Sequence, residues 1–273
     1  MKTLISKEDV LKMSYTDFIG FVNQWNVLPG AYITLSKWAV FSNLHNGSRV
    51  VDLACTSGFS SRELAILTGC SGVGVDISKP SIEIAQYNKT EYAQDIDVEY
   101  IHADACAFEP KEKFSHVIIG SALKFFPNPQ VLIDRIVSTY LIDGGVLLAS
   151  PFYVTKNIPK DLIERARSVF GITVTTENYK DIMKMYSGFE VLYEDRCTII
   201  KETDKELRHY CDSTINRACA IRNISDPIIK QAMYDRIMEI KRMSNDLRPY
   251  QMYSVLILRY RSCTYPCRYT ELF

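Results

Sequence analysis

Between residues 48 and 150, short apolar runs alternate with segments of helical periodicity, and this alternation leaves few folds open. The apolar runs predict buried strands at 49–55, 73–76, 98–102, 114–120 and 146–150. Helices are predicted between them at 60–67, 80–92 and 130–140, the first from the capping-box spacing of Ser60 and Glu63. Strands that alternate with helices form a parallel sheet covered on both faces. Right-handed crossovers then give a doubly wound α/β sheet.

The segments on either side of this alternation are mainly helical. Residues 1–47 show helical spacing with a break at 28–30. The last two strands are predicted at 189–200 and 252–259, with helices between them. The expected fold is therefore a mostly parallel, seven-stranded α/β sheet with N-terminal helices and a helical insertion between its last two strands. The predicted division of the chain is N-terminal helices at 1–47, an α/β core at 48–200, the helical insertion at 201–250, and the last strand and tail at 251–273.

Composition argues against two classes of partner. The chain carries 32 Lys and Arg against 32 Asp and Glu, whereas affinity for a nucleic-acid backbone comes mostly from clustered basic residues. No apolar run approaches the ~18 residues of a membrane span. The N-terminus becomes acidic at Glu8 and Asp9, before a signal-peptide core could form. We therefore expect a cytoplasmic protein without a nucleic-acid or membrane partner, and its oligomeric state is left open.

The cysteines do not indicate a disulfide framework or a metal site. The chain has 8 cysteines, none in a Cys-x-x-Cys pair, and we interpret them as reduced residues that mostly act as small core hydrophobes. Cys263 and Cys267 could form half of a metal site, but the other half is missing. Cys55 is also interpreted as a packing residue, because no basic partner that would activate its thiol lies near it in the sequence.

Acidic and small residues follow the ends of the predicted strands, where parallel sheets bind their ligands. After Asp52, small residues up to Gly58 allow close approach, and the next helix directs its free N–H groups to the same place. Asp76 ends the second strand 24 residues after Asp52, a spacing at which a carboxylate accepts ribose hydroxyls. Asp104 and Ser121 follow the third and fourth strands. An alternative is that these aspartates only cap helices or form turns.

The same segment indicates which kind of nucleotide would bind. A dinucleotide-binding loop requires Gly-x-Gly-x-x-Gly, and the corresponding positions here are Ala54, Thr56 and Phe59. The Gly-Lys-Ser/Thr sequence of a phosphate-binding P-loop does not occur either. The sequence therefore predicts a site for a nucleoside without phosphates.

Five segments of the core carry motifs in a defined order: 50–58 with 63–65, 72–78, 102–105, 114–119 with Leu123, and 141–147. Taken together they resemble the motifs of class I S-adenosylmethionine-dependent methyltransferases. One such motif would be weak, but five in order are specific for the Rossmann-like fold of that family. The resemblance implies S-adenosyl-L-methionine as the cofactor and methyl transfer as the reaction.

The resemblance also implies roles for the residues after the first strand. Asp52 would stand near the amino group of the methionine moiety. Ala54, Cys55, Thr56 and Gly58 would line the methionine portion of the cofactor. The family usually has glycine where this chain has Ala54 and Thr56, and both replacements are small.

The other strand ends would contact the nucleoside. Asp76 would bind the ribose, and Ile77 would lie against the face of the adenine. Asp104 would meet the adenine amino group with Ala105 beside it, and Ser121 would border the cofactor. Each of these roles is implied by position in the family's motifs.

Two residues are candidates for the reacting site. His209 lies at the start of the helical insertion, and a histidine that titrates near neutrality serves as a general base for a hydroxyl or amine acceptor; the alternative is an ordinary surface or core histidine. Tyr32 belongs to the N-terminal helices, which in the resembled family often form a lid over the cofactor. A carboxylate acceptor would need no base.

Three functions are compared. The first is a methyltransferase that acts on an oxygen or nitrogen of a small metabolite or peptide natural product, which suits the zero net charge and the aromatic-rich insertion. The second is an RNA- or DNA-modifying methyltransferase, but 120–126 lacks the Asn/Asp-Pro-Pro-Tyr/Phe motif usual in enzymes that methylate base amino groups. The third is a non-catalytic binding module, which Ala54 and Thr56 would allow. A metal-dependent methyltransferase is less expected, because no aspartate ends the fourth strand.

Overall fold

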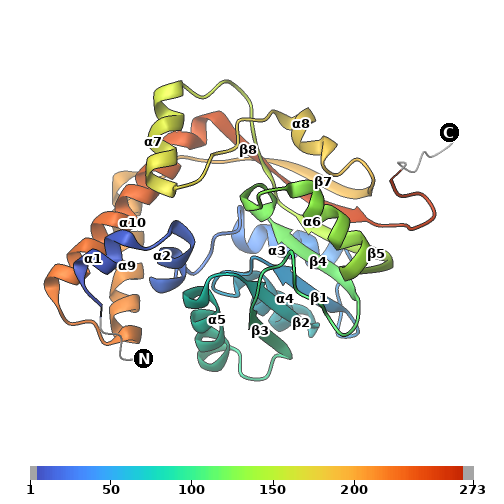
Figure 1. Ribbon diagram of the computed structural model, residues 1–273, viewed down its shortest axis with the longest axis horizontal. Helices are drawn as coiled ribbons and strands as arrows, with labels where there is room; N and C mark the ends of the chain where they lie inside the picture. Colours follow the sequence, from blue (N-terminus) through green and yellow to red (C-terminus); the bar gives the residue numbers. More distant parts are fainter. Residues whose placement is uncertain (1–4, 267–273) are drawn as a thin grey trace.

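The alternating segment forms the parallel sheet that the sequence predicts (Figure 1). The structure is a computed structural model and describes residues 5–266. The parallel strands lie in the order β3-β2-β1-β4-β5. Their bounds are β1 Arg49–Leu53, β2 Ser71–Asp76, β3 Val98–His102, β4 Phe114–Gly120 and β5 Leu141–Ala149. The order reverses between β1 and β4, which places the switch point of the sheet, the usual ligand position, beyond the ends of these two strands.

Antiparallel strands complete the sheet on one side. The strand β8 (Gln251–Arg259) pairs with β5 and with β7 (Glu190–Thr198). A short strand, β6 (Phe152–Val154), continues β5 along β8 after a break, where the backbone N–H of Ser254 donates to the carbonyl of Pro151 at 3.1 Å. The sheet of the described chain thus has eight strands instead of the seven predicted. The extra strand is missed because three residues after a proline have no periodicity to distinguish them from a loop.

Helices cover both faces of the sheet, and the three predicted at 60–67, 80–92 and 130–140 are found close to those bounds. The α-helices are α1 Lys7–Lys12, α2 Tyr15–Phe21, α3 Ala31–Phe41, α4 Phe59–Thr68, α5 Lys79–Tyr92, α6 Pro129–Arg135, α7 Lys160–Phe170, α8 Tyr179–Lys184, α9 Asp204–Arg222 and α10 Pro227–Leu247. Short 3-10 turns lie at Ala122–Phe125 and Arg248–Tyr250, and a π turn at Ile136–Tyr140 extends α6.

The start of α4 differs from the prediction. The capping box of Ser60 and Glu63 does not form, because α4 begins at Phe59 with Gly58 as its N-cap. Gly58 has a φ of +72°, a left-handed conformation that glycine adopts without steric cost. The N-terminal turn of α4 therefore follows directly from the loop after β1.

Side chains that alternate along the strands divide the sheet into two apolar faces. One face packs against α3, α4 and α5, through residues such as Trp38, Leu64 and Ala85. The opposite face packs against α6, its π extension and α8. The alternation follows from the strand period of two, since successive side chains point to opposite faces.

A third apolar core lies beside the sheet, at the left of Figure 1. It joins α1, α2, α7, α9 and α10, and Met233 and Ile237 of α10 are fully buried in it. We call these five helices the helical unit. The sequence-predicted groups at 1–47 and 201–250 thus share one core through α1, α2, α9 and α10, while α3 packs on the sheet. The four-part division of the chain stays a prediction.

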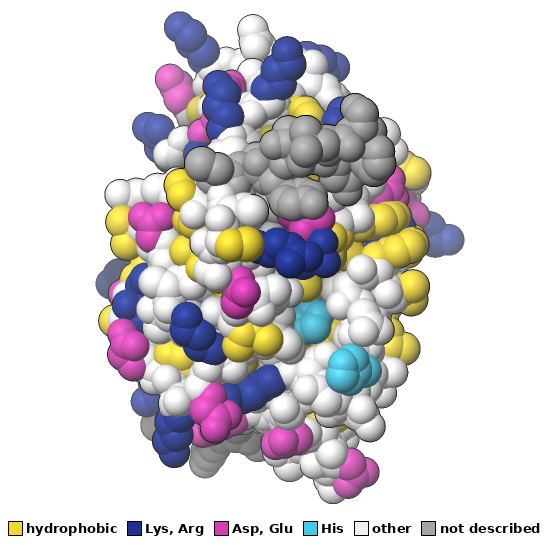
Figure 2. Space-filling view, turned by 90° about the vertical axis from the view of Figure 1, so that its right-hand side faces the viewer, with side chains coloured by type: hydrophobic (Ala, Val, Ile, Leu, Met, Phe, Trp, Pro, Cys, Tyr) yellow, Lys and Arg dark blue, Asp and Glu magenta, His cyan; other side chains and the backbone are white. Residues whose placement is uncertain are grey.

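The surface carries basic and acidic side chains interspersed, as the face in Figure 2 shows. Within residues 5–266, no helix is both long enough and apolar enough to span a membrane. Cys263 is exposed. Cys267, the other cysteine considered for half of a metal site, lies outside the described residues. So do residues 1–4, which belong to the N-terminal segment used to argue against a signal peptide.

Candidate functional site

The carboxyl ends of β1 and β2 bring two buried carboxylates close to one loop. Asp76 ends β2 and is 6% exposed. Its Oδ2 accepts the N–H of Thr56 at 2.9 Å, and its Oδ1 accepts the N–H of Ser78 at 2.8 Å. Burial raises the pKa of Asp76, and these two backbone donors oppose the rise. Asp76 therefore connects the loop after β1 to the start of α5.

Asp52 fixes the direction of α4. It is 4% exposed, and its Oδ2 accepts the N–H of Ser61 in the first turn of α4 at 3.1 Å. Burial raises the pKa of Asp52 to about 7, against the lowering effect of the Ser61 hydrogen bonds. One oxygen of Asp52 therefore does cap a helix, which was the alternative considered in the sequence analysis. Asp52 also lies beside residues 54–58, as the methyltransferase motif implies.

Residues 54–58, the loop between β1 and α4, have an unusual backbone conformation. Ala54, Thr56 and Gly58 have φ values of +59°, +47° and +72°. A left-handed conformation costs a non-glycine residue roughly 1–2 kcal/mol, so neighbouring contacts must hold the first two. A Cβ on Gly58 would lie 2.5 Å from the hydroxyl oxygen of Tyr100, so this position requires glycine for space as well. We call residues 54–58 the cofactor loop, after the role that the resemblance implies for this segment.

Cys55 is the second residue of this loop, and its side chain points into the core. Its side chain is 4% exposed and belongs to the apolar cluster with α3, α4 and α5. Burial is the largest cause that raises the pKa of its thiol. Its N–H donates to the carbonyl of Val75 at 3.1 Å, so Cys55 joins the loop to β2 and acts as the packing residue expected from the sequence.

The ends of β2 and β3 present residues suited to a flat apolar ring. Ile77 is 68% exposed although it follows a buried strand, and its carbonyl is 2.9 Å from Nε2 of His102. Asp104 is exposed, and its Oδ1 accepts the N–H of Cys106 at 2.8 Å. That hydrogen bond is the turn interaction raised as the alternative for Asp104. Ala105 beside it is buried.

The ends of β4 and β5 form the other side of the switch point. Gly120 has a φ of +51°, and its carbonyl accepts the N–H of Ser150 at 2.6 Å. Ser121 follows as the N-cap of the 3-10 turn and is partly exposed. The hydroxyl of Ser150 is buried and has no hydrogen-bond partner among the described residues. A Cβ on Gly120 would be 3.5 Å from Leu28, so the chain before α3 passes over this point.

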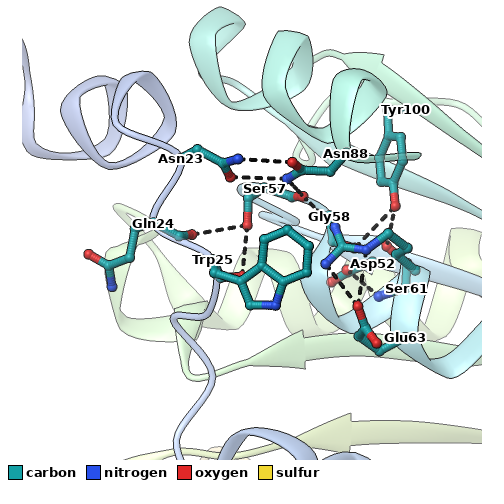
Figure 3. A network of polar contacts seen from close by, with 11 residues as sticks. Asn23, Gln24, Trp25, Asp52, Ser57, Gly58, Ser61, Glu63, Asn88 and Tyr100 are labelled. Carbon is teal, nitrogen blue, oxygen red and sulfur yellow. Dashed lines mark hydrogen bonds and ion pairs between the residues drawn. The ribbon is translucent and has the colours of Figure 1, made fainter. Parts of the chain in front are cut away.

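That segment, residues 22–30, connects α2 to α3, and we call it the strap. Figure 3 shows where it meets the cofactor loop: the hydroxyl of Ser57 donates toward the carbonyls of Gln24 and Trp25, at 3.1 and 3.2 Å. The guanidinium of Arg62 lies over the Trp25 ring at 4.3 Å. Arg62 also pairs with Glu63 at 2.9 Å and is fully buried.

Comparison with known proteins identifies the domain around this loop. A family model described as a methyltransferase domain matches residues 50–144. That range contains the cofactor loop, both buried aspartates and the ends of β1 to β4. Residues 50–144 form a methyltransferase domain of the class I, S-adenosylmethionine-dependent type.

Curated relatives and solved structures agree with this identification. The chain is 28% identical over 165 residues to a sterol 24-C-methyltransferase of Clavispora lusitaniae, and 30% identical over 104 residues to a ubiquinone biosynthesis O-methyltransferase of Stutzerimonas stutzeri. These matches cover 56% and 38% of this chain, and 42% and 44% of the relatives. The chain therefore spans less than half of the length of these relatives.

The structural matches extend beyond the domain that the sequences share. The crystal structure of the MccD protein has a TM-score of 0.69 and 26% identity, with 86% of this chain and 100% of that chain covered. A methyltransferase from Geobacter sulfurreducens in complex with S-adenosyl-L-homocysteine has a TM-score of 0.68 and 19% identity, and the match covers 89% of this chain and 98% of that one. The latter similarity supports the fold.

The residues of the methyltransferase domain fit the cofactor of this class, S-adenosylmethionine. Each oxygen of Asp76 accepts one backbone N–H, which leaves acceptor capacity for ribose hydroxyls. The exposed side chain of Ile77 offers an apolar surface to an adenine ring. The hydroxyl of Ser150 after β5, which has no hydrogen-bond partner among the described residues, would offer a further polar contact. The individual contacts of the ten cofactor residues named above stay predictions.

The two candidates for the reacting site lie in different places. Tyr32 of α3 is 55% exposed, and its ring meets the edge of Phe59 at 5.2 Å, at the start of α4. It thus lies next to the cofactor loop. His209 is exposed on α9, two turns or about 12 Å before Arg217 along the helix. Within residues 5–266 no hydrogen bond or ion pair connects His209 to the strand ends.

The sequence prediction did not include the residues that hold the loop from outside. Asn23, Asn88, Arg62 and Tyr100 each make a hydrogen bond to the loop or to a residue that contacts it. The available signal was Asn23, an asparagine at a helix end, where this residue type favours a left-handed conformation. Its φ is +50°. Its partner could not be found from the sequence, because Asn88 is 65 residues away.

Proposed function

We propose that this chain transfers a methyl group from S-adenosylmethionine to an oxygen or nitrogen of a small metabolite or peptide natural product. The observation that carries the proposal is the buried carboxylate of Asp76 at the end of β2, bonded to the N–H of Thr56 in a loop without a phosphate cradle. The names of curated relatives, which include ubiquinone biosynthesis and sterol methyltransferases, support a small acceptor.

The cofactor supplies a methyl group on a sulfonium, which is already a good leaving group. The protein must then bind the adenosyl group, direct the acceptor in line with the methyl and exclude water. Asp76 and Ile77 would bind the nucleoside, and the cofactor loop would bind the methionine portion. The strap would exclude water, since it passes over the cofactor loop and beside Gly120.

A hydroxyl or ammonium acceptor must also lose a proton, whereas a carboxylate need not. Tyr32 is the better placed candidate for this step, because its ring contacts Phe59 beside the cofactor loop. His209 could act only on an acceptor that extends along α9 toward its exposed side chain. A solution test of Tyr32→Phe, which keeps the ring contact and removes the hydroxyl, separates packing from proton transfer.

The test is to incubate the protein with S-adenosylmethionine labelled in its methyl group and with a cell extract, and to identify labelled products by mass. We expect a labelled small molecule or peptide, and much less of it with Asp76→Ala at a subsaturating cofactor concentration. The matched control is Asp95→Ala, which should leave the product unchanged. Asp95 is exposed and precedes β3, at the amino-terminal end of the strands and away from the proposed site. Labelled RNA would instead support an RNA-modifying enzyme, and cofactor binding without any product would support a binding module.

A further inference from the structure

The cofactor loop depends on contacts from outside the motif. Ala54 and Thr56 occupy left-handed conformations that glycine would adopt without strain. Strained backbone of this kind persists only where surrounding structure fixes it. The question is which part of the molecule fixes residues 54–58 in this conformation.

The strap supplies one set of these contacts. Ser57, the fourth residue of the loop, donates its hydroxyl toward the carbonyls of Gln24 and Trp25. Ser57 is 1% exposed, so water does not compete for these hydrogen bonds. The hydroxyl therefore fastens the loop to the strap at two successive carbonyls.

A buried amide pair supplies a second set, which Figure 3 shows above Ser57. Asn23 of the strap and Asn88 of α5 exchange hydrogen bonds at 2.9 and 3.0 Å, and both side chains are fully buried. Asn88 also donates to the carbonyl of Ser57 at 3.2 Å, and Arg62 donates to the same carbonyl at 3.2 Å. The peptide after Ser57 is thus held by side chains from α4 and α5, and Asn23 of the strap holds one of these side chains, Asn88, in place.

The strap itself is fastened to the helical unit. Arg217 of α9 donates from Nη2 to the carbonyl of Asn23 at 2.9 Å. An arginine with the same kind of contact lies elsewhere in the unit: Arg236 of α10 donates to the carbonyls of Val10 and Met13 at the end of α1. The first contact leads to the cofactor loop through Asn23, whereas the second leads to α1.

We propose that Arg217 is a positioning residue, which acts through the strap to hold the non-glycine cofactor loop in its left-handed conformation. Cofactor affinity then depends on a contact made by the helical unit. The proposal rests on the proposed function for the identity of the cofactor, but the conformation of the loop can be measured without any ligand.

The test compares Arg217→Met with the matched control Arg236→Met by calorimetric titration with S-adenosylhomocysteine. Arg217→Met should weaken binding about fivefold, the effect of one hydrogen bond, while Arg236→Met should leave it within about twofold. Thermal unfolding of both variants checks that they fold. Arg217→Lys, which retains a donor, should recover most of the affinity. An equal loss for Arg217→Met and Arg236→Met would overturn the proposal, because it would indicate general destabilisation.

A double variant tests whether Arg217 acts by opposing the strain in the loop. In protein that carries Ala54→Gly and Thr56→Gly, the loop is less strained, so adding Arg217→Met should change cofactor affinity by less than about twofold. An undiminished fivefold effect would contradict the proposal. Hydrogen exchange of the loop amides in cofactor-free protein should rise in Arg217→Met and not in Arg236→Met, and unchanged exchange would overturn the proposal. Wild-type protein that bound no S-adenosylhomocysteine would contradict the proposed function and leave this exchange test intact.

Discussion

Different interactions stabilise two regions of the molecule, the carboxyl ends of β1 and β2, called the sheet edge below, and the helical unit. At the sheet edge, two buried carboxylates and a left-handed loop are joined by hydrogen bonds to particular backbone N–H groups. In the helical unit, α1, α2, α7, α9 and α10 share an apolar core. Directional hydrogen bonds define a binding geometry, whereas apolar packing tolerates many arrangements of similar volume. Removing a ligand-facing polar group in the first region should therefore mainly change ligand affinity, and truncating the apolar core of the second should mainly change stability.

The largest effect is expected in the core of the helical unit. Ile237→Ala removes a fully buried side chain of α10 and should lower the free energy of unfolding by about 4 kcal/mol, since such truncations also leave a cavity. Cofactor affinity of the folded protein should not change. The control is Ile228→Ala on the same helix, where the side chain is 62% exposed. Denaturant unfolding measures both, and a large loss of affinity in Ile237→Ala would break the comparison.

The second largest loss of stability is expected from a side chain added at Gly58, in the loop after β1. Gly58→Ala combines a left-handed φ with a Cβ placed 2.5 Å from the Tyr100 hydroxyl, and should lower stability by about 3 kcal/mol. Gly171→Ala is the matched control, because Gly171 has a φ of +67° with nothing within 4 Å of its Cβ. It should cost only about 1 kcal/mol. Equal losses in thermal unfolding would mean that Tyr100 moves away freely.

The carboxylate of β2 should matter for binding more than for folding. Asp76→Ala removes the group expected to accept ribose hydroxyls and should weaken S-adenosylhomocysteine binding by about 2 kcal/mol, roughly 30-fold. Calorimetry of Asp76→Ala beside Asp95→Ala measures the difference. An unchanged dissociation constant in Asp76→Ala would show that the pocket lies elsewhere.

The carboxylate of β1 should instead make stability depend on pH. The pKa of Asp52 is raised to about 7 in the folded protein, from 3.8, so between these values the folded state binds more protons than the unfolded state. Stability should therefore fall as pH rises from about 4 to 7, by up to about 1.4 kcal/mol per pH unit from this group. Asp52→Asn should flatten that slope in denaturant unfolding, and a slope identical to wild type would contradict the assignment.

The comparison also separates what the sequence encodes locally from what it does not. The bounds of β3 and β4 and the position of Asp76 were predictable, because strand ends and their spacing are properties of a short segment. The capping box at Ser60 was wrong because Gly58 in a left-handed conformation starts α4 earlier. No short-range pattern pairs Asn23 with Asn88 or with Arg217, which are 65 and 194 residues away.

The acceptor side of the site could be predicted least. Tyr32 lies beside the cofactor loop and His209 lies on the exposed face of α9, yet both had similar support in the sequence. Their placement depends on how α3 packs on the sheet and how α9 packs in the helical unit. Such packing involves apolar stripes that fit several partners equally well.

The most direct measurement is a crystal structure of the protein with S-adenosylhomocysteine at saturating concentration. The account predicts the ribose hydroxyls within hydrogen-bond distance of the Asp76 carboxylate, and the amino-acid end of the ligand along residues 54–58. A ligand bound at another surface, or no ligand beside Asp76 at saturation, would contradict it.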